Sequence, residues 1–69
     1  MSNLKNELRT LIDYWVEHNR EHGQEFHEWA EKATPLGNEV TQSLSEAADK
    51  MAEVNNCLEK ARQALAKEG

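Results

Sequence analysis

Residues 40–65 read VTQSLSEAADKMAEVNNCLEKARQAL, and the apolar residues among them recur in alternating steps of four and three. Because an α-helix turns once in about 3.6 residues, this spacing gathers the apolar side chains along one side of a helix. The stripe consists of Val40, Leu44, Ala47, Met51, Val54, Leu58, Ala61 and Leu65. We therefore predict a helix that packs lengthwise against another helix.

The first half of the chain carries a comparable stripe that includes both tryptophans. Its members are Leu4, Leu8, Leu11, Trp15, His22, Phe26, Trp29 and Ala33. Ile12, Val16 and Ala30 widen this stripe on one side. Aromatic side chains at helical spacing usually belong to a core, so we expect Trp15 and Trp29 to be core residues.

A short break separates the two stripes at TPLGN, residues 34–38. The residue before a proline is disfavoured in a helix, so the first helix should span about residues 3–33. Gly37 can adopt a positive φ, and Asn38 is a good N-cap for a second helix over about residues 38–67. Since a short loop makes neighbouring helices antiparallel, we predict an all-α, two-helix hairpin that occupies residues 1–69 as one domain.

Two helices cannot cover stripes of this width between them. A chain of 69 residues also has a small core, and such chains are commonly stabilised by a disulfide, a metal or a partner. Pairing of two hairpins would cover the remaining apolar surface. We therefore predict a homodimer that forms a four-helix bundle, with a larger helical assembly as the alternative.

The composition limits the classes of partner. Thirteen acidic and eight basic residues give a net charge of −5, and the basic residues are scattered singly. Nucleic-acid and anionic-membrane binding both require a basic face, so neither partner is expected. The N-terminal sequence does not resemble a signal peptide, and Cys57 has no second cysteine with which to pair. We expect a cytoplasmic protein whose partners are other proteins, first of all a second copy of itself.

One group of side chains has the spacing of a metal site. His18 and His22 are four residues apart, and Glu25 follows three residues later on the same side of the helix. Two imidazoles on adjacent turns can chelate a Zn, Ni or Cu ion, with Glu25 as a candidate third ligand. Residue 19 is Asn, so the zinc-protease signature, which has Glu at that place, is absent.

The alternative interpretation of His22 is a polar layer within the core. If the chain reverses near residues 35–36, position 22 lies opposite about residues 49–50. Position 18 would lie opposite about residues 53–54, so that Asp49, Glu53 and Asn55 would be hydrogen-bond partners of the two histidines. His27 points to the opposite side of the helix and should be exposed.

Residues 14–22, YWVEHNREH, together with Phe26 and WAEK at residues 29–32, resemble an uncharacterised family of short helical hairpins. The resemblance covers mainly the first helix. It implies a small protein that stands alone or forms a tail on His-rich, metal-related proteins, and it implies no activity. It favours metal binding at His18 and His22.

Nothing in the sequence forms an active site. The three glycines are not clustered into a phosphate loop, and no histidine follows a glutamate by three residues as in di-metal bundles. We therefore expect no enzymatic activity. The leading hypothesis is a non-catalytic, acidic, helical interaction module that acts as a homo-oligomer, and the alternative is a transition-metal-binding module that uses His18 and His22.

Overall fold

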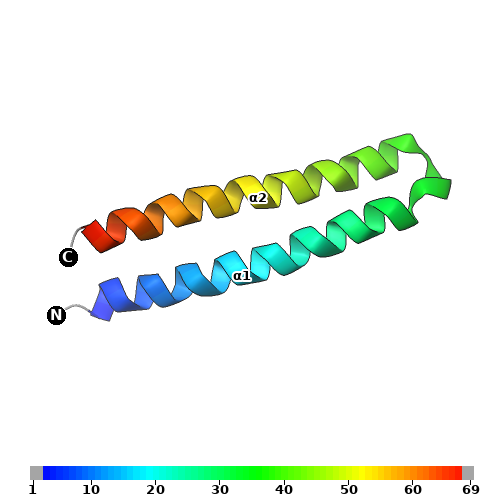
Figure 1. Cartoon of the computed structure of the whole chain (residues 1–69). Helices are drawn as coiled ribbons and strands as arrows, with labels where there is room; N and C mark the ends of the chain where they lie inside the picture. The colour runs from blue at the N-terminus through cyan, green and yellow to red at the C-terminus, as the bar shows by residue number, and fades with distance from the viewer. Residues whose placement is uncertain (1–2, 68–69) are drawn as a thin grey trace.

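The computed structural model describes residues 3–67 as two long helices joined by a tight turn. Helix α1 spans Asn3–Lys32, the 3₁₀ helix η1 spans Thr34–Leu36, and α2 spans Asn38–Lys67. The two long helices lie side by side and run in opposite directions (Figure 1). The predicted all-helical hairpin is therefore confirmed, with α1 ending one residue before the expected boundary. No helix within residues 3–67 is long and apolar enough to cross a membrane.

The chain reverses through η1 and Gly37. Pro35 lies in the first turn of η1, where its missing N–H breaks no helical hydrogen bond. Gly37 has φ 117° and ψ 158°. Its carbonyl oxygen accepts a hydrogen bond from the Thr41 N–H at 3.3 Å, which is the first bond of α2. Gly37 therefore occupies the N-cap position, and Asn38, the predicted cap, is the first helical residue instead.

The two glycines of the hairpin should respond oppositely to alanine. The backbone angles of Gly37 lie in a region that only glycine adopts, so Gly37→Ala should lower the free energy of unfolding by about 1–3 kcal/mol. A Cβ on Gly23 would meet the Met51 Cβ at 3.4 Å, an ordinary contact. Because alanine favours a helix over glycine, Gly23→Ala should be neutral or stabilising by up to about 1 kcal/mol. Urea denaturation measures both, and effects of the same sign would contradict this account.

We call the interface between α1 and α2 the seam. On each helix, the residues that form the seam are spaced alternately four and three positions apart in the sequence. Asn19 Nδ2 donates a hydrogen bond to Asn55 Oδ1 at 3.1 Å, and Asn55 Nδ2 donates to the Val16 carbonyl oxygen at 3.0 Å. On α1 the buried or half-buried seam residues are Ile12, Val16, Asn19, Gly23, Phe26 and Ala30, and the buried Ala33 continues the series directly after the helix. On α2 the half-buried seam residues are Thr41, Leu44, Ala48, Met51, Asn55, Leu58, Arg62 and Leu65.

In the single hairpin, Trp15 and Trp29, which the sequence predicts as core residues, lie beside the seam and are exposed. Trp15 is 39% exposed and Trp29 is 57% exposed, whereas Ile12 and Val16 are 1% and 5% exposed. The seam is formed along the edge of the stripe that Ile12, Val16 and Ala30 widen. Small side chains explain why this edge packs against α2. Gly23 allows α2 to approach to within contact distance, whereas a tryptophan at this place would hold the two helices apart.

The alignment of the helices also differs from the expected one. Asn19 and Asn55, which are hydrogen-bonded to each other, lie equally far along the chain from Gly37. The chain therefore reverses about Gly37 rather than at residues 35–36, and this shifts the pairing by two to three residues. Position 22 consequently does not lie opposite residues 49–50, and the prediction that it does is wrong.

An ion-pair group lies on the seam near the open end of the hairpin. Arg62 contacts Glu59 one turn earlier and Asp13 of α1. Its Nε also donates a hydrogen bond to Glu59 Oε1 at 3.1 Å. The hydrogen bonds with Glu59 and Asp13 raise the pKa of Arg62 above its ordinary value. This group adds a polar contact between the two helices.

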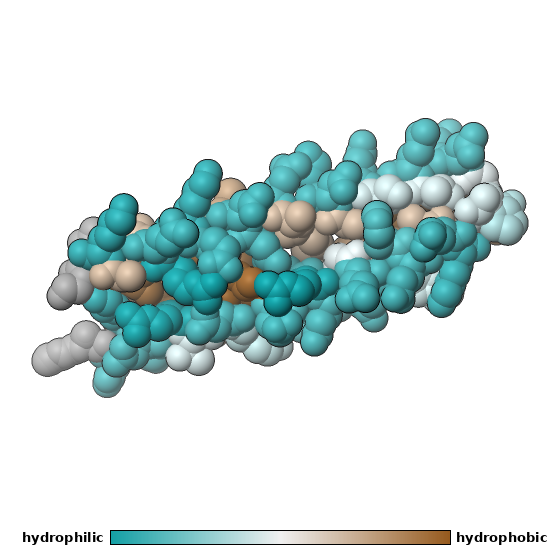
Figure 2. Space-filling view, viewed as in Figure 1, coloured by the Kyte–Doolittle hydropathy of each residue, from teal (hydrophilic) through white to brown (hydrophobic). Residues whose placement is uncertain are grey.

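The hairpin has two broad faces of different character. Two antiparallel helices are related by an approximate two-fold axis perpendicular to the plane that contains both helices. Residues that immediately precede a seam residue in the sequence therefore lie on the same side of this plane in both helices. We call this side the apolar face. On α1 it carries Leu4, Leu8, Leu11, Trp15 and Trp29, and on α2 it carries Val40, Ala47, Val54 and Ala61. Hydrophilic side chains cover most of the surface seen in Figure 2, with apolar residues visible between them.

Candidate functional site: a histidine pair on the apolar face

His18 and His22 lie within the apolar stripe of α1. The steps of four and three that lead from Leu11 through Trp15 continue to His18, His22, Glu25 and Trp29. The polar group therefore interrupts the stripe near the middle of α1, which spans Asn3–Lys32. The structure brings together all three residues that the sequence predicted for a metal site.

The two imidazoles meet through their Nε2 atoms. His18 Nε2 lies 3.0 Å from His22 Nε2, and the rings are nearly perpendicular at 88°. His22 Nδ1 lies 3.0 Å from Glu25 Oε1. An ionised carboxylate only accepts hydrogen bonds, so His22 Nδ1–H is the donor and its Nε2 carries a lone pair in the neutral ring. This is the orientation that metal-binding histidines commonly take when a carboxylate supports them.

Aromatic rings lie at both ends of the pair. The Tyr14 ring stacks on His18 with centroids 5.3 Å apart, and the Phe26 ring stacks on His22 with centroids 6.1 Å apart. These contacts restrict rotation of the imidazoles and hold their Nε2 atoms on the same side. Sequence reasoning did not assign this role to Tyr14 or Phe26, although their spacing of four residues from the histidines was the available signal.

The pair is close to the geometry of a two-ligand chelate. Two nitrogens bound to a tetrahedral zinc ion at about 2.0–2.1 Å would lie about 3.3–3.4 Å apart. The observed 3.0 Å is a few tenths of an ångström shorter. Within residues 3–67 no group of three or more His, Cys, Asp or Glu side chains is arranged to hold a metal ion. Glu25 contacts Nδ1 of His22. In this position Glu25 orients His22 as a metal ligand and is not itself a ligand.

The cross-helix residues predicted as hydrogen-bond partners of His18 and His22 do not bond them. Asn55 bonds Asn19 and the Val16 carbonyl oxygen, while His22 contacts His18 and Glu25 of its own helix. The alignment about Gly37 accounts for this difference, because it places Asn55 at the level of Asn19.

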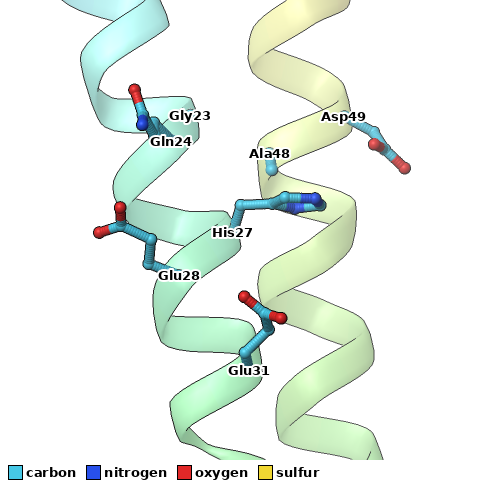
Figure 3. A pocket seen from close by; sticks show the side chains of 7 residues that line it. All are labelled: Gly23, Gln24, His27, Glu28, Glu31, Ala48 and Asp49. Atoms are coloured by element: carbon cyan, nitrogen blue, oxygen red, sulfur yellow. The ribbon is translucent and has the colours of Figure 1, made fainter.

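His27 lies away from the pair, as its position on the helix predicted. It is exposed and lines a shallow pocket with Asp49 of α2 and Glu31 of its own helix. In Figure 3 its ring extends from α1 toward Ala48 and Asp49 of α2. It therefore provides a matched control histidine for experiments on the pair.

The fold and the site define a small helical hairpin with a partly exposed histidine pair. The family described as "Domain of unknown function (DUF8180)" matches residues 8–65, and the chain belongs to this family. An uncharacterized protein of Archaeoglobus fulgidus is 43% identical over 54 residues, which are 78% of this chain and 87% of the relative. No solved structure matches the chain. The resemblance to an uncharacterised family is thereby confirmed, and neither description names an activity.

Proposed function

We propose that this protein is a non-catalytic interaction module that pairs with a second copy of itself through the apolar face. The observation that carries the proposal is the exposure of that face in the single hairpin. Trp15 is 39%, Leu11 44%, Val54 46% and Trp29 57% exposed. Among residues 3–67, the hydrophobic residues buried by the hairpin alone are Ile12, Val16, Ala30 and Ala33. A core this small is marginal without further burial.

The face has the shape expected for pairing with itself. Its α1 side carries large residues, among them Leu8, Trp15 and Trp29, while its α2 side carries valine and alanine. A two-fold pairing that lays α1 of each copy over α2 of the other places large side chains against small ones. Such interdigitation is what close packing between helices requires. The result would be a four-helix bundle with most polar residues outside and with His18, His22 and Glu25 at the interface of the two copies.

Three further points belong to the same proposal. The exposed thiol of Cys57 is compatible with the reducing conditions of the cytoplasm. The acidic balance of the chain supports solubility of the assembly and offers no basic surface for nucleic acid. The family resemblance adds to the proposal a role as a stand-alone small protein or as a tail attached to a His-rich, metal-related protein.

Sedimentation equilibrium over a concentration series tests the pairing directly. We expect a dimer at micromolar concentration and a melting temperature that rises with protein concentration, because only the folded hairpin binds its partner. A single monomeric mass and an unchanged melting temperature over a hundredfold range of concentration, both with and without zinc, would contradict the proposal.

Transition-metal binding by His18 and His22 is the second candidate function. The observation that favours it is the pair of Nε2 atoms 3.0 Å apart, with Glu25 hydrogen-bonded to Nδ1 of His22. A carboxylate in this place strengthens a histidine ligand and fixes its orientation. The experiment below tests this candidate together with its consequence for assembly.

A further inference from the structure

We propose that one divalent transition-metal ion binds between two copies of the chain, held by His18 and His22 of each copy. Metal binding and pairing would then stabilise each other. This inference rests on the proposed pairing through the apolar face and extends it, because it names a ligand and makes assembly depend on it.

The histidine pair of one chain supplies too few ligands for a complete metal site. Zinc sites in proteins are usually four-coordinate, and the chain supplies two converging nitrogens. Residues 3–67 contain no third ligand arranged beside them. The remaining coordination positions point away from α1 into the space above the apolar face. In the proposed pairing, a second hairpin occupies that space.

The position of the pair along the helix makes a second copy a suitable source of ligands. His18 and His22 lie near the middle of α1, which spans Asn3–Lys32. When two hairpins overlap along their full length, the middle of one lies over the middle of the other. Both histidine pairs then come to about the same height. Four imidazoles can therefore surround one ion without loss of overlap.

Charge gives a physical reason for the coupling. Pairing removes His22 and Glu25, whose side chains are 41% and 62% exposed, partly from water. Two copies bring two Glu25 carboxylates to one apolar interface, where like charges repel and desolvation is costly. An ion of charge +2 bound by four neutral imidazoles balances these two negative charges. Without the metal, the same group of residues opposes assembly.

The donor set selects the class of ion. Imidazole nitrogens suit Zn, Ni and Cu, whereas Ca and Mg require oxygen ligands. Binding releases the hydrogen bond between the two Nε2 atoms, and His18 moves its proton from Nε2 to Nδ1 through solvent. No oxidation or reduction takes place.

The test is sedimentation equilibrium of the full chain with and without zinc chloride, combined with native mass spectrometry. Cys57→Ser is used as the background so that the thiol cannot bind the metal. We expect one zinc per two chains and a dimer dissociation constant at least about tenfold lower with zinc than with a chelator. His18→Ala and His22→Ala should each remove the effect of zinc, while both variants remain helical by circular dichroism. His27→Ala should leave the effect intact, and Glu25→Gln should weaken it.

The outcomes separate this inference from the proposed function. A dimer that takes up no zinc, or one zinc per chain without tighter pairing, would overturn the inference and leave the pairing in place. An equal loss with His27→Ala would also overturn the inference. A chain that is monomeric with chelator and dimeric with zinc would support the inference. A monomer under both conditions would overturn both proposals.

Discussion

Ile12→Ala is expected to lower the free energy of unfolding by about 2–5 kcal/mol, which is the usual cost of truncating a fully buried isoleucine. Ile12 is 1% exposed and lies on the seam, one residue before Asp13, which contacts Arg62 of α2. Truncation leaves a cavity that neighbouring side chains can fill only by moving the two helices. Because small domains are stable by about 5–15 kcal/mol, this loss is a large fraction of the total.

Urea denaturation followed by circular dichroism measures this effect at fixed protein concentration. Leu36→Ala is the matched control, because Leu36 is an aliphatic residue that is 74% exposed. Its truncation should change the free energy of unfolding by no more than about 0.5 kcal/mol. A small effect of Ile12→Ala, or equal effects of both substitutions, would show that the seam does not pass through Ile12.

The hairpin itself could be predicted from the sequence because its signals are local. Pro35 and Gly37 mark the turn, and the alternation of steps of four and three on both sides indicates two packed helices. These signals depend on residue type and spacing alone. The element boundaries consequently agree with the structure to within one residue.

The choice of seam could not be predicted in the same way. Apolar periodicity identifies a wide stripe, but it does not say which edge of the stripe faces the neighbouring helix. In the structure Gly23 and Ala30 decide this, because small residues allow closer contact than Trp15 or Trp29. A hydrophobicity pattern assigns the largest side chains to the interface, whereas the approach of two backbones depends on the smallest. The sequence therefore predicts Trp15 and Trp29 as core residues, whereas in the single hairpin they lie exposed beside the seam.

The spacing of residues in the sequence located the candidate site, but it did not predict the geometry of that site. Positions 18, 22 and 25 predict side chains on one side of a helix, and they lie there. Whether Glu25 is a metal ligand or the residue that orients His22 depends on side-chain rotamers. The spacing of residues in the sequence does not fix these rotamers. The stacking of Tyr14 on His18 and of Phe26 on His22 holds the rings so that Nδ1 of His22 meets Glu25.

Trp15→Lys is expected to weaken pairing of two hairpins by about 2–4 kcal/mol, a rise of roughly thirtyfold to nearly a thousandfold in the dissociation constant. Trp15 lies on the apolar face one turn from His18, and the substitution replaces a large aromatic contact with a charge that pairing would desolvate. Trp15 is preferred to Trp29 for this test, because the Lys32 Nζ already lies 4.7 Å from the centre of the Trp29 ring.

Gln24→Lys is the matched control, since it introduces the same charge at an exposed position beside the pocket of His27. We expect sedimentation equilibrium to give an unchanged dissociation constant for this control. Circular dichroism at the same concentrations reports whether the hairpin released by Trp15→Lys stays helical. Its seam residues, Ile12 and Val16 among them, are untouched by the substitution, so a helical monomer is the expected product. If both lysine variants pair as tightly as the parent chain, the apolar face is not the surface through which the copies meet.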